Sequence, residues 1–251
     1  MQKVISISRV VAAVTLLAFS VPVHASKTDD RIESSAKKSY VFKTYLKGDD
    51  IKIKSSEGVV TLSGTVSEES HKALANDTVA GLPSVKSVDN KLEVKTAPPA
   101  MGSDEWLITK VKTTLLFHRS VSAGKTEVFA KDGIVTLRGE AATLAQKDLT
   151  TEYAGDVEGV KGVNNEMVVK STKKHKQTLG DKIDDASITA QVKMTLLNHR
   201  STSAVKTSVT TKRAVVTVSG KAANKAEKDL VSKLVADING VKSVTNLMTI
   251  E

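Results

Sequence analysis

Residues 132–139 read Asp132-Gly133-Ile134-Val135-Thr136-Leu137-Arg138-Gly139, and the chain repeats this pattern twice more. The other copies are Gly58-Val59-Val60-Thr61-Leu62-Ser63-Gly64 and Ala214-Val215-Val216-Thr217-Val218-Ser219-Gly220. An Asp-Gly pair next to alternating apolar residues is typical of a β-hairpin, because the turn needs positive φ. The third copy has Arg213-Ala214 at this turn, which predicts either another turn type or a slightly strained one.

A second motif follows each hairpin at a fixed distance. Residues 160–165 read Val160-Lys161-Gly162-Val163-Asn164-Asn165, and residues 85–90 and 241–246 repeat this pattern. In every copy, 26 residues separate the closing glycine of the hairpin from the last asparagine. A fixed spacing within copies indicates one folding unit used three times.

Each unit reads as helix, hairpin, helix and strand. Apolar residues at intervals of four mark one face of the first helix. These are Leu107, Val111 and Leu115 in the second copy, Ile188, Val192 and Leu196 in the third, and a weaker set, Ile32, Ala36 and Tyr40, in the first. We therefore expect an α+β protein of three tandem αββαβ domains, each a three-stranded mixed sheet with two helices on one face.

Two residue types recur at structurally demanding places. We expect the closing glycines, Gly64, Gly139 and Gly220, to let another part of the chain pass close to the backbone. Asn90, Asn165 and Asn246 share their side of the last strand with apolar residues. A buried amide is costly unless it is hydrogen-bonded, so we interpret these asparagines as struts that bond the backbone of a neighbouring loop, not as ligands.

The N-terminus predicts export. Lys3 and Arg9 precede the apolar run from Val10 to Phe19, and small residues end the segment, as in a signal peptide of residues 1–25 cleaved near Ala25-Ser26. The chain has 0 Cys, which excludes both disulfides and a lipidated N-terminal cysteine. We expect a soluble, non-lipidated protein, located in the periplasm of a Gram-negative cell.

The charge is uneven along the chain. Residues 171–251 hold 14 basic and 7 acidic side chains, and the rest of the mature chain is nearly neutral. The basic part could bind anionic lipid headgroups, although ordinary solvated lysines explain it as well. Its candidate lipid-binding residues are Lys173, Lys174, Lys176, Lys193, Arg200, Lys212 and Arg213. Export and an aromatic content of 3% argue against nucleic acid as a partner.

The residues give no catalytic constellation, metal cluster or cofactor motif, so we expect a non-enzymatic protein without cofactors. His71 and His175 stand alone. His118 and His199 are equivalent, each in Leu-Leu-x-His-Arg-Ser, and Lys43 takes that position in the first copy. A basic residue near a helix C-terminus complements the helix dipole, and this interpretation covers all three residues.

The expected boundaries follow from the repeat. The domains are residues 26–95, 104–170 and 181–251, joined by a proline-stiffened linker of residues 96–103 and a basic linker of residues 171–180. The polar, basic composition of the second linker predicts that the third unit moves more freely than the second.

These residues together carry a family resemblance. The pattern Gly-x-Val-x-Leu-x-Gly, a helix, and then Gly-Val-x-x-Val-x-Asn resembles the BON (bacterial OsmY and nodulation) domain, and the exported tandem arrangement is similar to the osmotically inducible periplasmic group. The resemblance implies the αββαβ fold, periplasmic action under osmotic or envelope stress, association with phospholipid surfaces, and no catalytic residues. The alternative is a chaperone-like scaffold that contacts envelope proteins or unfolded clients through exposed sheet faces or edges.

Overall fold

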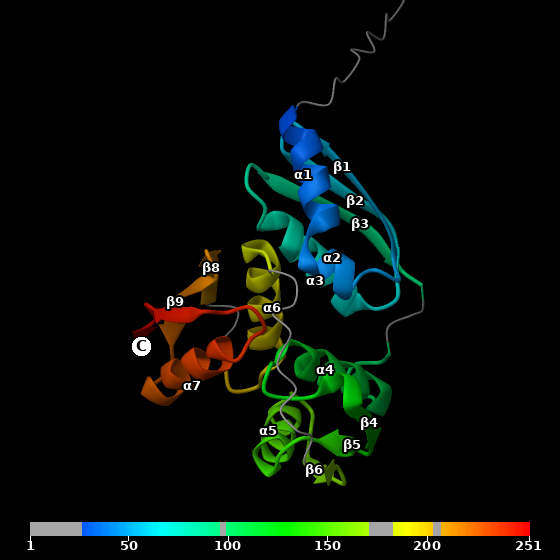
Figure 1. Ribbon diagram of the computed structural model, residues 1–251, viewed down its shortest axis with the longest axis vertical. Helices are drawn as coiled ribbons and strands as arrows, with labels where there is room; N and C mark the ends of the chain where they lie inside the picture. The colour runs from blue at the N-terminus through cyan, green and yellow to red at the C-terminus, as the bar shows by residue number, and fades with distance from the viewer. Residues whose placement is uncertain (1–26, 96–98, 171–182, 203–206) are drawn as a thin grey trace, which may run out of the picture.

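The computed structural model describes residues 27–95, 99–170, 183–202 and 207–251 (Figure 1). These residues form three units of one design, here called unit 1 (27–95), unit 2 (99–170) and unit 3 (183–251). The predicted signal peptide and basic linker lie outside the described residues.

The helices and strands follow the same order in each unit. Unit 1 contains α1 (Lys27–Lys38), α2 (Tyr40–Thr44), β1 (Asp50–Ser56), β2 (Val59–Val66), α3 (Glu69–Ala80) and β3 (Ser87–Val94). Unit 2 contains α4 (Asp104–Phe117), the 3-10 turn η1 (Ala123–Lys125), β4 (Thr126–Lys131), β5 (Ile134–Ala141), α5 (Leu144–Gly155), β6 (Gly162–Asn165) and β7 (Val168–Val169). Unit 3 contains α6 (Asp185–Asn198), β8 (Thr207–Lys212), β9 (Val215–Ala222), α7 (Lys225–Ala236), β10 (Ser243–Asn246) and β11 (Thr249–Ile250).

Each unit has one mixed sheet, which confirms the predicted α+β fold class. The last strand is divided in two in units 2 and 3, so these two sheets have four strands where three were predicted. The second hairpin strand is central: it pairs antiparallel with the first strand and parallel with the last. In β2, Val60 and Leu62 are fully buried beneath the helices, whereas Thr61 between them is only half-buried. The period of two thus places the apolar residues against the helices.

The closing glycines permit a close approach of the first hairpin strand. Gly139 has a φ of 121°, and a Cβ added to it would lie 1.9 Å from the carbonyl oxygen of Lys125. At Gly64 the same atom would lie 2.0 Å from the carbonyl oxygen of Asp50, and Gly220 has a φ of 129°. Only glycine combines this dihedral angle with this separation.

The recurring asparagine joins the last strand to the second helix. Asn165 donates from Nδ2 to the carbonyl oxygen of Lys147 on α5, at 2.9 Å, and its Oδ1 accepts from the amide of Met167 at 3.0 Å. The same two bonds are made by Asn90, with Lys72 and Leu92, and by Asn246, with Lys228 and Met248. The backbone partner is therefore a helix carbonyl, where we expected a loop.

An aspartate from the first helix holds each hairpin turn. Asp185 accepts hydrogen bonds from the amides of Arg213 and Ala214, both at 2.7 Å, and Asp29 and Asp104 do the same in units 1 and 2. Arg213 and Ala214 have φ values of 54° and 63°, so the third turn has the same conformation as the other two. Of the two alternatives, the strained turn is the one found, with alanine in a region that favours glycine.

Ala214→Gly is expected to raise the free energy of unfolding by about 0.5–1 kcal/mol, because relief of the left-handed strain exceeds the added entropy of the unfolded chain. Urea unfolding measures the change. Ala226→Gly, an exposed site on α7, is the matched control and should lower stability by a similar amount. Equal effects of the two substitutions would contradict the strained turn.

The first helix of unit 1 is shorter than its apolar pattern predicts. Ile32 and Ala36 are buried on α1 as expected, but the helix ends before Ser39. The hydroxyl of Ser39 accepts from the amide of Phe42 at 3.4 Å and starts α2. Tyr40 therefore belongs to a second, short helix, because a serine cap competes with continuation of the first.

Unit 3 is anchored by α6, which lies between α3 and the rest of its own unit (Figure 1). Eleven of its 14 residues are buried, including small and polar ones. Ser187 accepts a hydrogen bond from the amide of Val41 at 3.1 Å, and Ala186 lies against Gly81 at the end of α3. Small side chains at these positions let the two units pack closely.

The cores divide the molecule into two bodies. Units 1 and 3 share one apolar cluster, which Phe117 of unit 2 also enters, whereas the rest of unit 2 has a cluster of its own. We predicted from the linker that unit 3 moves more freely than unit 2. The linker composition carries no information about the apolar contacts of α6, which join unit 3 to unit 1.

Candidate functional site

The hairpin tip of unit 3 is a cluster of exposed cations. Lys212 ends β8 and Arg213 begins the turn that Asp185 holds. The amide of Lys242, at the start of the last strand, donates to the carbonyl oxygen of Ala214 at 2.8 Å. All three cationic residues are exposed, and no ion pair between described residues involves them. We call Lys212, Arg213 and Lys242 the basic tip.

The same place carries less positive charge in the other units. In unit 1 the tip has Glu57 and Lys86, whose charges cancel. In unit 2 it has Lys131, Asp132 and Lys161, a net charge of one positive unit, and Lys161 donates to the carbonyl oxygen of Asp132 at 3.1 Å. The basic tip has three positive charges, so the repeat itself supplies two internal comparisons for it.

The structure does not gather the other predicted lipid-binding residues around the basic tip. Lys193 pairs with Asp77 of unit 1 at 3.5 Å, and Arg200 pairs with Asp156 of unit 2 at 3.7 Å. Arg200 follows the end of α6, about 20 Å from the tip at the start of that helix. Lys173, Lys174 and Lys176 lie outside the described residues.

Sequence reasoning missed Lys242. A signal existed, since a Val-Lys pair starts the last strand of every unit. Only the parallel register of that strand with the central strand brings the lysine beside the hairpin turn.

Units 2 and 3 meet through a second polar cluster, which we call the clasp: His118, Arg119 and Asp237 on one side, and His199, Arg200 and Asp156 on the other. The contact is reciprocal, because the loop after the first helix of each unit meets the loop after the second helix of the other. The amide of Arg119 donates to the carbonyl oxygen of Asp237, and the amide of Arg200 to that of Asp156, both at 3.0 Å.

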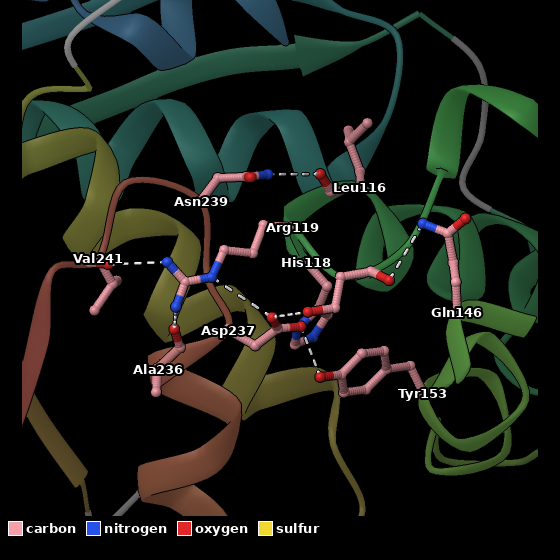
Figure 2. Close-up of polar contacts among 10 residues, drawn as sticks. Leu116, His118, Arg119, Gln146, Tyr153, Ala236, Asp237, Asn239 and Val241 are labelled. Carbon is pink, nitrogen blue, oxygen red and sulfur yellow. Dashed lines mark hydrogen bonds and ion pairs between the residues drawn. The ribbon is translucent and has the colours of Figure 1, made fainter. Parts of the chain in front are cut away.

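Asp237 is the most connected residue of the clasp (Figure 2). The hydroxyl of Tyr153 donates to it at 2.7 Å, and the hydroxyl of Ser120 also donates to it. Arg119 lies 3.7 Å away and donates to the carbonyl oxygens of Val241 and Ala236. Burial raises the pKa of Asp237, but its contacts with His118, Ser120 and Tyr153 outweigh burial and leave the pKa below its usual range.

The histidines correct an expectation from the sequence. We interpreted His118 and His199 as cations at helix ends, yet their side chains are 0% and 2% exposed at the interface of two units. Burial lowers the pKa of His199, and nearby Asp156 offsets this only in part. Lys43, at the same position in unit 1, is exposed, so one position has two different roles.

The clasp lacks the geometry of a hydrolytic site. The Ser120 hydroxyl donates to Asp237 and not to His118, so these three side chains do not form a Ser-His-Asp triad. Among the described residues, no group of three or more His, Cys, Asp or Glu side chains could hold a metal ion. The described helices include none long and apolar enough to cross a membrane.

Three comparisons with known proteins bear on these observations. The family model of the BON domain matches residues 28–96, 103–171 and 184–251. Osmotically-inducible protein Y of Escherichia coli (strain K12) is 32% identical over 146 residues, which are 57% of this chain and 73% of that protein.

Two further likenesses are weaker. The 21 kDa hemolysin of Actinobacillus pleuropneumoniae is 30% identical over 115 residues, or 45% of this chain and 59% of the hemolysin. A solved chain of CdsD, a structural protein of the type III secretion system of Chlamydia trachomatis, aligns over 88% of this chain and 90% of its own. At 15% identity and a TM-score of 0.24, that alignment carries no argument.

Proposed function

Because the chain belongs to the BON domain family, we propose that it is an exported, non-enzymatic osmotic-stress protein of the cell envelope that associates with anionic phospholipid surfaces. The likeness to osmotically-inducible protein Y supports the stress role. The leader-like residues 1–25 support export to the periplasm.

The basic tip is the observation that carries the lipid part of the proposal. Three exposed cations lie at one end of a hairpin, and the turn amides behind them are already bonded to Asp185. The backbone is thus fixed, and the side chains are left to reach headgroup phosphates. Each Lys or Arg near an anionic bilayer contributes about 1 kcal/mol at modest salt.

Vesicle sedimentation tests this proposal. The protein recovered after export, with its N-terminus defined by mass spectrometry, is mixed with vesicles of anionic phosphatidylglycerol or of neutral phosphatidylcholine. We expect binding to the anionic vesicles alone, and its loss as salt rises from about 0.01 to about 1 M, where the Debye length falls from about 30 to about 3 Å. Binding that ignores salt or headgroup charge would refute the lipid proposal.

The alternative, a chaperone-like scaffold, rests on a different surface. Phe129 and Ile134 are 45% and 44% exposed on the outer face of the unit 2 sheet, where an apolar client segment could pack. If the protein ignores anionic vesicles at low salt but suppresses aggregation of an unfolded client, this alternative replaces the lipid proposal. Phe129→Ser should then weaken the suppression.

A further inference from the structure

The clasp buries two imidazoles that have few hydrogen bonds. Nδ1 of His118 lies 3.3 Å from Asp237, and Nε2 of His199 lies 3.2 Å from Asp156, both outside hydrogen-bond geometry. Of the four ring nitrogens, only Nδ1 of His199 has a partner within the described part of the chain, the amide of Ser201 at 3.3 Å. Nδ1 of His199 faces an N–H donor, so a proton added to that atom would meet another donor in place of an acceptor.

The fixed charges of the clasp already balance one another. Asp237 faces Arg119 at 3.7 Å, and Asp156 faces Arg200 at 3.7 Å, so two carboxylates meet two guanidinium groups. A proton added to the imidazole of His199 is thus an excess positive charge in a buried place.

The surroundings of the two imidazoles differ. Tyr153 of α5 stacks on His118, with ring centroids 3.8 Å apart and planes 12° apart, and this ring face favours a cation. Burial raises the pKa of Tyr153, so its phenol stays neutral. In unit 3 the equivalent position is Leu234, which leaves His199 without an aromatic neighbour of this kind.

Other charged groups near the clasp lie at its rim. Glu152 and Lys161 line a shallow depression of unit 2 together with Asp156 and Arg200. Their opposite charges cancel, and within the described part of the chain neither forms a hydrogen bond or ion pair with an imidazole, so they do not supply a counter-charge for an added proton.

The division of the core lets the clasp open without unfolding either body. Unit 2 keeps its own apolar cluster. Its links to the cluster of units 1 and 3 are Phe117, whose ring centroid lies 5.3 Å from that of Tyr45, Tyr153, which packs against both clusters, and contacts of α4 with α6. Separate cores with a small shared contact are typical of parts that separate as units.

We propose that the clasp is acid-sensitive: a proton taken up by His199 releases unit 2 from units 1 and 3 and uncovers Phe117, Val157 and Ile238. These three side chains are at most 1% exposed in the closed form. Acidification thereby exposes an apolar surface from a protein that stays folded.

The direction follows from proton linkage. In the closed clasp the pKa of His199 lies below the ordinary value of 6.5, which an exposed imidazole regains on opening. Opening therefore takes up a proton, so the closed form has its full stability above about pH 6.5 and loses it as the pH falls below this value. With one imidazole taking up a proton, the ratio of open to closed molecules grows by up to about 10-fold per pH unit.

Energy transfer between two dyes measures the opening. The chain has 0 Cys, so Asn164→Cys on unit 2 and Ser208→Cys on unit 3 provide unique exposed labelling sites in the full chain. Transfer is recorded from pH 8 to about pH 4.5, a range that brackets the ordinary histidine pKa. Far-UV circular dichroism is recorded on the same samples.

We expect transfer to fall below pH 6.5 while the circular dichroism stays constant, with close to one proton taken up per opening. His199→Gln should remove this acid response, whereas His118→Gln, the matched control at the equivalent position of unit 2, should keep it. Constant or rising transfer in the unsubstituted labelled chain would overturn the proposal, and so would a fall in transfer that coincides with loss of helical signal.

Discussion

Gly139→Ala is expected to destabilise unit 2 by at least about 3 kcal/mol, which is enough to unfold a domain of this size. The added Cβ would lie 1.9 Å from the carbonyl oxygen of Lys125, the last residue before β4, and a backbone atom cannot rotate away as a side chain can. The φ of 121° adds strain that any residue with a Cβ would feel. Urea unfolding followed by circular dichroism measures the loss.

Gly124→Ala is the matched control for this prediction. It lies in η1, on the approach to the same hairpin, and a Cβ there would meet no atom within 4 Å. Its stability should stay within about 0.5 kcal/mol of the original chain, as for most surface substitutions. If Gly139→Ala were as mild as Gly124→Ala, the close approach of β4 and β5 would be wrong.

The second prediction concerns the basic tip. Reversal of its three charges by Lys212→Glu, Arg213→Glu and Lys242→Glu is expected to weaken binding to anionic vesicles by more than about 100-fold at low salt. The contributions of the three cations to the binding free energy add to about 3 kcal/mol, and every 1.4 kcal/mol changes the affinity by a factor of ten. Sedimentation at constant salt gives both affinities.

The control reverses the same number of charges at the tips of the other two units, by Lys86→Glu, Lys131→Glu and Lys161→Glu. Both variants have the same net charge, so they separate a local contact from a general effect of charge on the long-range field. The control should lose no more than about a tenfold factor, as expected from long-range attraction alone. Equal losses in the two variants would show that the basic tip has no special role.

The hairpins were predictable because their requirements are local. A positive φ at the turn, alternating apolar residues and a glycine at the close approach all leave their mark within eight residues. The last two recur in all three copies, and the turn glycine in the first two. The asparagine struts were half predictable. They lie on the apolar side of the last strand, so their amides were expected to need a backbone partner. Only the structure identifies this partner as a helix carbonyl.

The packing between units was not predictable in the same way. The outer face of α6 has Ala186, Ser187 and Gln191. Small and polar side chains of this kind are expected to face solvent, yet all three are buried. Contacts of this kind depend on a complementary surface in a distant part of the chain, which no local pattern records. The Leu-Leu-x-His-Arg-Ser segments shared by units 2 and 3 were the available sequence signal for the clasp. Burial of a leucine in the core explains why a leucine is shared, but it does not explain the shared His-Arg-Ser.

The candidate site shows the same limit. Charge counting found Lys212 and Arg213, which stay exposed, but it also selected Lys193 and Arg200, whose charges pair with other units. Whether a lysine is free or paired depends on tertiary contacts, and composition cannot distinguish the two.

The burial of α6 bears on how a chain with three copies of one module can evolve. A tandem array of independent modules could gain or lose a copy by recombination without harm to the rest. Here a deletion of the third copy would strip unit 1 of the helix that covers its apolar residues. Units 1 and 3 are therefore expected to be inherited together. Natural variants with a different number of copies should retain both of them.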